Sequence, residues 1–151
     1  MGTIGATFFV IGIGLLYMST GTLNMADLAD KIADQRNSRT VHAAFAFIVV
    51  GMGLKAAIYP LHLWLPNAYS FAPSPVAAFL SGTATKMAIY VLLRFMFTVF
   101  QPEFLEEIRI LEAIILPFAI LAMFASSMSA FAQKDLKRML AHSSVAQLGY
   151  M

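Results

Sequence analysis

The sequence predicts an all-α, polytopic transmembrane helix bundle, and three observations predict it. Of the 151 residues, 60% are hydrophobic and only 12% are charged, about half the charged share of an average soluble domain. The mean hydropathy is +0.76. The apolar residues stand in long blocks rather than in short periodic faces, which is typical of helices that cross a bilayer.

Four of these apolar blocks are long enough to cross the hydrocarbon: residues 3–19, 41–59, 76–100 and 108–132. We expect helices, because lipid offers no partners to the backbone groups of an open strand. Residues 139–151 turn apolar again, but a full span needs about 20 residues. This last segment is either a half-helix or, as we favour, the start of a fifth span.

The connections differ in composition. Residues 21–40 are polar and contain a candidate surface helix at 25–32, with Asn24 or Asp27 as its cap. Residues 61–75 are uncharged and rich in proline and aromatic residues, and 101–107 form an acidic turn. With four spans, the proline-rich connection and the short basic turn at 134–138 lie on the same side, which we expect to be the cytoplasmic side because of that charge.

Small residues mark the faces on which these helices can pack. Ala122, Ser126 and Ala130 recur every four residues, and Gly51 and Gly53 lie in the second span. Such stripes let two transmembrane backbones approach closely.

Two lysines, Lys55 and Lys86, lie inside the predicted spans. A lysine near the bilayer centre costs about 2.5–3.5 kcal/mol on insertion scales, so it is a functional candidate by default. The alternative is snorkelling to the headgroups from a helix end. Gly82, Thr83 and Tyr90 share the helical face of Lys86 and predict a small, polar stripe suited to a hydrated path.

Pro60 predicts a break in the second span, because proline has no amide hydrogen for the carbonyl of Ala56. Broken helices at membrane depth mainly line wet, protein-enclosed cavities. His62 and His142 are further candidates because histidine titrates near neutral pH, although each has a purely structural alternative. His42 begins the second span and is expected at the interface.

Other kinds of site find no support in the sequence. The chain has no cysteine, no histidine pair with metal-ligand spacing, and no nucleophile constellation or phosphate-binding loop. We therefore expect no cofactor, no metal and no nucleic-acid partner. A lysine whose partner moves can take up and release a proton, so Lys55 and Lys86 could form a relay. The competing interpretation is a structural subunit whose lysines only pack.

At this point the residues resemble a known family. The matching stretches are Leu54 to Tyr69 with its Lys–Pro–His–Trp–Leu–Pro pattern, Ala72 to Val76, Thr85-Lys86, Tyr90 to Arg94, and Asp135 to Tyr150. They are similar to the antiporter-like membrane subunits shared by respiratory complex I, membrane hydrogenases and Mrp-type cation/proton antiporters. Residues 17–29 are similar to the D-type branch of Mrp. Asn67 and His142 depart from the commonest pattern, which has Asp and Tyr there.

The resemblance implies a partial membrane domain, 1–151, that corresponds to about the sixth to the tenth helix of a larger fold. It implies that Lys55 lies on a discontinuous helix, that Lys86 lies on the next one, and that both belong to a proton path. Their glutamate partner on an earlier helix, and a charged residue on a later broken helix, have no counterpart in these residues, so the fragment alone should not transport.

The function that we expect is proton translocation coupled to Na⁺/H⁺ antiport, in a multisubunit complex of the cell (inner) membrane. The alternative is a proton-pumping subunit of a complex I-like NADH:quinone oxidoreductase or a membrane hydrogenase. In either case the expected partners are lipid, other subunits, protons and monovalent cations. We expect a transporter subunit rather than an enzyme in its own right.

Overall fold

The structure is a computed structural model that describes residues 1–109 and 111–151, without the side chains of residues 107, 108, 111 and 112. The described chain is helical throughout, with connecting turns and no strand. Its α-helices are α1 (Gly2–Thr20), α2 (Met25–Asp34), α3 (Arg39–Ala56), α4 (Trp64–Phe71), α5 (Ser74–Arg94), α6 (Gln101–Ile108), α7 (Leu116–Phe131) and α8 (Leu136–Tyr150). Two wider π-helical turns are η1 (Phe95–Val99) and η2 (Leu111–Ile115).

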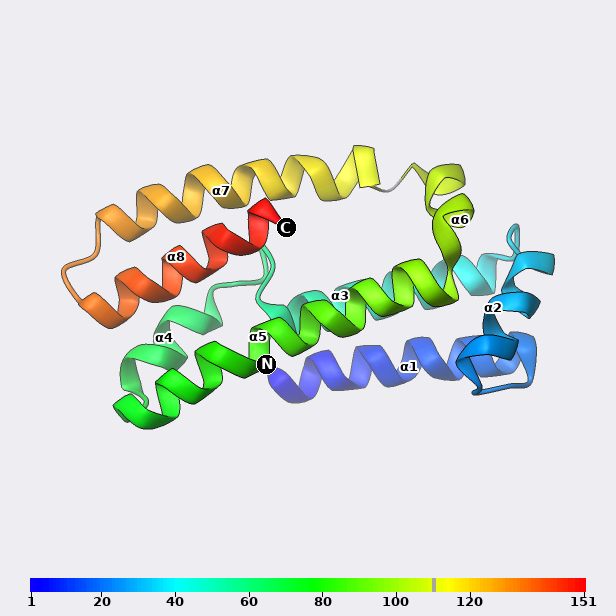
Figure 1. Cartoon of the computed structure of the whole chain (residues 1–151), viewed down its shortest axis with the longest axis horizontal. Coiled ribbons are helices and arrows are strands. Elements are labelled where there is room, and N and C mark those ends of the chain that lie inside the picture. Colours follow the sequence, from blue (N-terminus) through cyan, green and yellow to red (C-terminus); the bar gives the residue numbers. More distant parts are fainter. Residues whose placement is uncertain (110) are drawn as a thin grey trace.

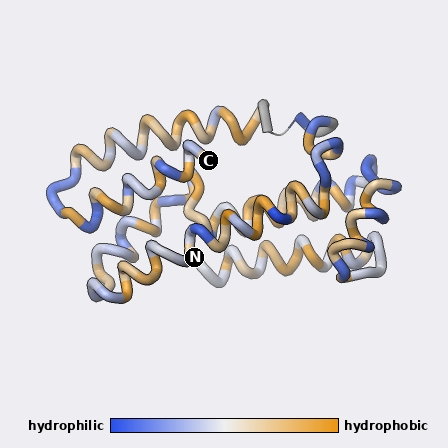
Figure 2. Tube along the Cα trace, in the orientation of Figure 1, coloured by the Kyte–Doolittle hydropathy of each residue, from blue (hydrophilic) through white to orange (hydrophobic). Residues whose placement is uncertain are grey.

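Four helical stretches are long and apolar enough to cross a membrane, which confirms the predicted spans. They are Gly2–Thr20, Arg39–Ala56, Ser74–Val99 and Ala113–Phe131. Figure 2 shows apolar residues along the bodies of these helices and hydrophilic residues gathered at the two ends of the molecule. That distribution is the one that a hydrocarbon slab between two aqueous layers selects.

The helices form two groups (Figure 1). In the first group α3 packs against both α1 and α5, and in the second group α7 and α8 form an antiparallel hairpin. Contacts between α4 and α8 join the groups at one end of the molecule. Helices α2 and α6 lie at the opposite end, so the proline-rich connection and the basic turn share one end, as predicted.

Glycines bring α1 and α3 into close contact. A Cβ atom added at Gly51 would lie 2.7 Å from the Phe9 nitrogen and 2.8 Å from the Gly5 oxygen, and one at Gly12 would lie 2.9 Å from the Ala44 oxygen. The prediction for Gly51 is therefore confirmed. Gly53 does not serve the same purpose, because its nearest such neighbour is a side-chain carbon of Leu61 at 3.8 Å.

The small-residue stripe of α7 packs against α8. Ala122 and Ser126 are buried and Ala130 is half-buried. A Cβ atom at Gly149 of α8 would lie 2.8 Å from the Ala119 oxygen and 3.1 Å from the Ala122 Cβ. The predicted close approach is thus made by α7 and α8.

The prediction of an acidic turn at 101–107 was wrong, because these residues form α6. The helix presents Phe104 and Leu105 to the core. Phe104 packs against the rings of Phe45 and Phe100, with centroids 5.6 Å and 5.2 Å away. Gln101 turns the chain between η1 and α6 with a φ of 64°, so tertiary packing overrides the local turn signal.

Helix α2 is an amphipathic surface helix, slightly longer than predicted. Of the two candidate caps, Asn24 is the one used, because its side chain accepts a hydrogen bond from the Ala26 amide at 3.1 Å. Lys31 pairs with Asp27 at 3.3 Å and donates to the Thr20 carbonyl at 3.2 Å. The hydrogen bond from Thr22, followed by that from Lys31, holds the pKa of the Asp27 carboxyl below its ordinary value.

Candidate functional site

The predicted helix break near Pro60 is present and separates α3 from α4. Helix α3 ends at Ala56, and Ala57 adopts the left-handed conformation with φ 59°. The amides of Ala57 and Ile58 both donate to the Gly53 carbonyl. The indole of Trp64, the first residue of α4, donates to the Leu54 carbonyl at 3.0 Å. A side chain from beyond the break thus satisfies a carbonyl of the last turn.

Lys55 lies in the last turn of α3, directly before this break. Its side chain is half-buried, and its Cγ lies 3.2 Å from the position that a Cβ on Gly5 would occupy. The aliphatic stem of Lys55 therefore packs against α1 at Gly5, where α1 and α3 approach closely.

Lys86 lies in the middle of α5 and is exposed. Gly82, Thr83 and Tyr90 are exposed with it, so the predicted stripe forms one open face. The Lys86 ammonium donates to the Ser81 carbonyl at 3.2 Å. Within residues 1–109 and 111–151, as far as their side chains are described, neither Lys55 nor Lys86 pairs with a carboxylate.

His62 and His142 come together, although they lie far apart in the sequence. His62 belongs to the connection between α3 and α4 and is 7% exposed. The His142 ring, from α8, lies with its centroid 6.3 Å from that of His62, at an interplanar angle of 70°. Tyr59 stacks on His62 at 5.0 Å. Both histidines were predicted as candidates but their pairing was not, since no local signal in the sequence relates the break to α8.

The two rings differ in burial, since His62 is buried and His142 is half-buried. Both Nδ1 atoms are buried and have no hydrogen-bond partner among the described residues. Burial, and then the charge of His142, lower the pKa of His62, which lies outside the four spanning helices. Nearby, Lys137 of α8 donates to the carbonyl of Ala72 at the end of α4, at 3.0 Å. The basic turn therefore fastens α8 to α4.

The third histidine, His42, has a structural role. Its Nδ1 donates to the Ser38 carbonyl at 2.8 Å at the start of α3. Its ring packs against Phe104 with centroids 5.3 Å apart. The prediction that His42 begins the second span is consistent with this position.

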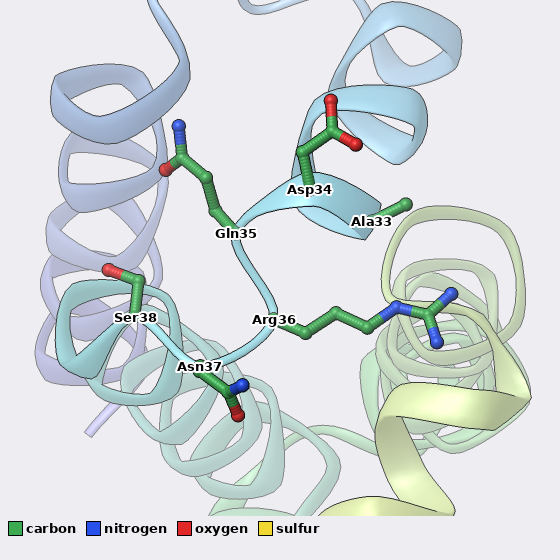
Figure 3. A pocket seen from close by; sticks show the side chains of 6 residues that line it. All are labelled: Ala33, Asp34, Gln35, Arg36, Asn37 and Ser38. Atoms are coloured by element: carbon green, nitrogen blue, oxygen red, sulfur yellow. The ribbon is translucent and has the colours of Figure 1, made fainter.

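Two cavities accompany these features, and neither is lined by Lys55, Lys86, His62 or His142. One of ≈ 380 Å³ lies between the two helix groups and is lined mainly by apolar side chains. The other, ≈ 510 Å³, is a surface hollow at the turn from α2 to α3. In Figure 3 its side chains diverge: Gln35 extends toward α1, where it donates to the Ser19 carbonyl at 3.2 Å, while Arg36 extends the other way. No three potential metal ligands cluster in the described part of the chain.

Comparison with known proteins identifies the fold. The whole chain, residues 1–151, matches the family described as NADH:quinone oxidoreductase/Mrp antiporter, transmembrane. It is 44% identical over 151 residues to the N subunit of the NADH-quinone oxidoreductase of Desulforudis audaxviator. It is 32% identical over 151 residues to the D subunit of the Na⁺/H⁺ antiporter of Alkalihalophilus pseudofirmus. In both alignments the chain is covered completely and spans 30% of the relative.

A solved structure agrees with this result. The membrane-bound sulfane sulfur reductase, an archaeal respiratory membrane complex, contains a chain that superposes with a TM-score of 0.85 at 34% identity. The match covers 99% of this chain and 30% of the other. The helix order, the break after α3 and the sequence match lead to the same conclusion. The chain belongs to the NADH:quinone oxidoreductase/Mrp antiporter transmembrane family, whose members are multi-pass proteins of the cell membrane.

Proposed function

We propose that this chain forms part of the proton path of a multisubunit membrane complex, with Lys55, Lys86, His62 and His142 as its ionisable groups. The observation that carries the proposal is the placement of Lys55 in the last helical turn before an interruption that itself contains His62. An interrupted helix exposes unpaired backbone groups that water can hydrate. Ionisable side chains at the interruption can exchange protons with that water.

Lys86 extends this path along α5. Lys86 shares an exposed face with Gly82, Thr83 and Tyr90, whose side chains are small or polar. This face suits a hydrated passage once another part of the protein covers it. A lysine that gains and loses a carboxylate neighbour alternates between holding and releasing its proton. We propose that this carboxylate lies in the rest of a longer protein, of which the chain provides about the sixth to the tenth helix.

Two energy sources remain for the whole protein. One is antiport, in which Na⁺ or another monovalent cation exchanges for protons, as the name of the Alkalihalophilus relative states for that protein. The other is redox chemistry in a neighbouring subunit of a quinone oxidoreductase. The 44% identity to the Desulforudis relative supports this second source. In both, this chain moves protons and does no redox chemistry itself.

Substitution of the two lysines tests the proton path. In the assembled complex reconstituted in vesicles, Lys55→Ala and Lys86→Ala should each lower proton flux by at least about 100-fold, the usual effect of losing a proton-transfer group. Lys31→Ala is the matched control, because Lys31 forms a surface pair with Asp27 on α2. Unchanged flux in both span variants, with normal assembly, would refute the proposed path.

The energy source is tested on the same vesicles. A Na⁺ gradient that acidifies or alkalinises the lumen without any redox substrate supports antiport. Proton uptake that requires NADH or another reductant, and ignores the Na⁺ gradient, supports the oxidoreductase alternative.

A further inference from the structure

The structure places two histidines from distant parts of the sequence at the junction of the helix break and α8. The centroids of His62 and His142 are 6.3 Å apart. Their Nδ1 atoms are buried and have no partner among the described residues. A buried imidazole nitrogen without a hydrogen bond is costly, so each of these neighbouring rings calls for a further polar partner.

We propose that His62 and His142 act as one titrating unit that holds a single proton between them through a bridging water. A direct ring-to-ring hydrogen bond needs nitrogens about 3 Å apart, which is closer than these ring centres permit. One water can span the gap while accepting from one ring and donating to the other. The proposal deepens the proposed function at one site and does not depend on either energy source.

Electrostatics limits the pair to one charge. At an effective dielectric constant of about 20, two unit charges at this separation repel strongly enough to move the second protonation by about two pH units. Tyr59 stacks on the His62 ring, and burial reduces access to water that could screen the repulsion.

Other ionisable groups near the pair do not neutralise it. On α8, Arg138 lies one turn before His142, and Lys137 is occupied with the Ala72 carbonyl. On α4, the Tyr69 hydroxyl is buried and has no partner among the described residues.

The helices that pack around α4 and α8 add no carboxylate. Helix α7 has no ionisable side chain between Leu116 and Phe131. The ionisable groups that α5 contributes between Ser74 and Arg94 are Lys86, Tyr90 and Arg94 itself. The carboxylate of Asp135 caps α8 about two turns before His142, where it accepts from the Lys137 amide, so it is not a direct partner of a second proton on the pair.

The test is a histidine titration by ¹⁵N solid-state NMR on the assembled complex in liposomes. In the unmodified protein, the resonances of both rings should respond at two separated steps, as coupled groups do. Replacing His142 by Gln should remove the repulsion, so that His62 titrates in a single step whose midpoint lies about two pH units above the second step of the unmodified pair. His62→Gln should have the reciprocal effect on His142.

His42→Gln is the matched control, because His42 is bonded to the Ser38 carbonyl and should leave both titrations unchanged. The unmodified protein alone decides the matter if a variant fails to assemble. The proposal is overturned if the two histidines of the unmodified protein titrate independently, each in a single step. It is also overturned if the His62 midpoint is unshifted in His142→Gln. Both conclusions hold even if Lys55 and Lys86 prove essential for transport. Coupled titration in a complex whose lysine variants still transport would uphold this inference and refute the proposed path.

Discussion

The indole Nε1 of Trp64 donates a hydrogen bond to the Leu54 carbonyl oxygen at 3.0 Å across the break between α3 and α4. Trp64 suits an aromatic belt by composition, yet here its polar atom is used internally. The bond sets the distance between the end of one helix and the start of the next. It therefore helps to position Lys55, which follows Leu54 directly.

Trp64→Phe tests this role, because it keeps an aromatic ring and removes the donor. We expect a loss of about 1–3 kcal/mol of stability, since the Leu54 carbonyl loses a partner in a partly buried site. Thermal denaturation of the assembled complex measures it. Tyr17→Phe is the control, because no hydrogen bond of the Tyr17 hydroxyl is found in the described structure. Equal effects of the two variants would contradict the assigned bond.

Gly51→Ala should separate α1 from α3. The added Cβ would meet the Phe9 nitrogen at 2.7 Å and the Gly5 oxygen at 2.8 Å, and backbone atoms cannot move aside cheaply. We expect a destabilisation of about 1–3 kcal/mol, measured by denaturation in detergent. Gly14→Ala provides the comparison, since a Cβ at Gly14 of α1 meets nothing within 4 Å. A stable Gly51→Ala protein would exclude the close contact.

The position of α2 should depend on pH through Asp27. The pKa of Asp27 is lowered in the folded state. The stabilisation of α2 by the ionised Asp27 is therefore fully present above the ordinary carboxyl pKa, and it is lost as the pH falls through the lowered pKa. Hydrogen exchange of the α2 amides should therefore speed up in acid beyond its intrinsic rate change. Asp27→Asn should abolish this dependence, and Asp30→Asn on the same helix should preserve it.

The basic turn should face the cytoplasm. This chain has no cysteine, so in a protein whose remaining cysteines are replaced Gln133→Cys can be labelled selectively with an impermeant maleimide. We expect labelling in inverted membrane vesicles and protection in intact cells. Asn37→Cys, in the turn between α2 and α3, should show the reverse pattern. Identical labelling of both sites would exclude the predicted arrangement of spans.

The spans were predictable because length and hydropathy alone decide them. The break was predicted near Pro60, but the helix already ends at Ala56, and no local pattern indicates the left-handed conformation of Ala57. Helix α6 was missed because burial of Phe104 depends on Phe45 in a distant helix. The same reason explains why the sequence named His62 and His142 without pairing them.

The break also limits which side chain fits at its first residue. Ala57 is completely buried against Leu65, Tyr69, Ala141 and Val145, while its backbone occupies a region that costs an L-residue about 1–2 kcal/mol. Glycine would relieve that backbone cost and leave a void, whereas any bulkier residue would wedge α4 and α8 apart. Backbone conformation thus favours glycine at position 57 and packing favours a side chain, and the single methyl group of alanine satisfies both.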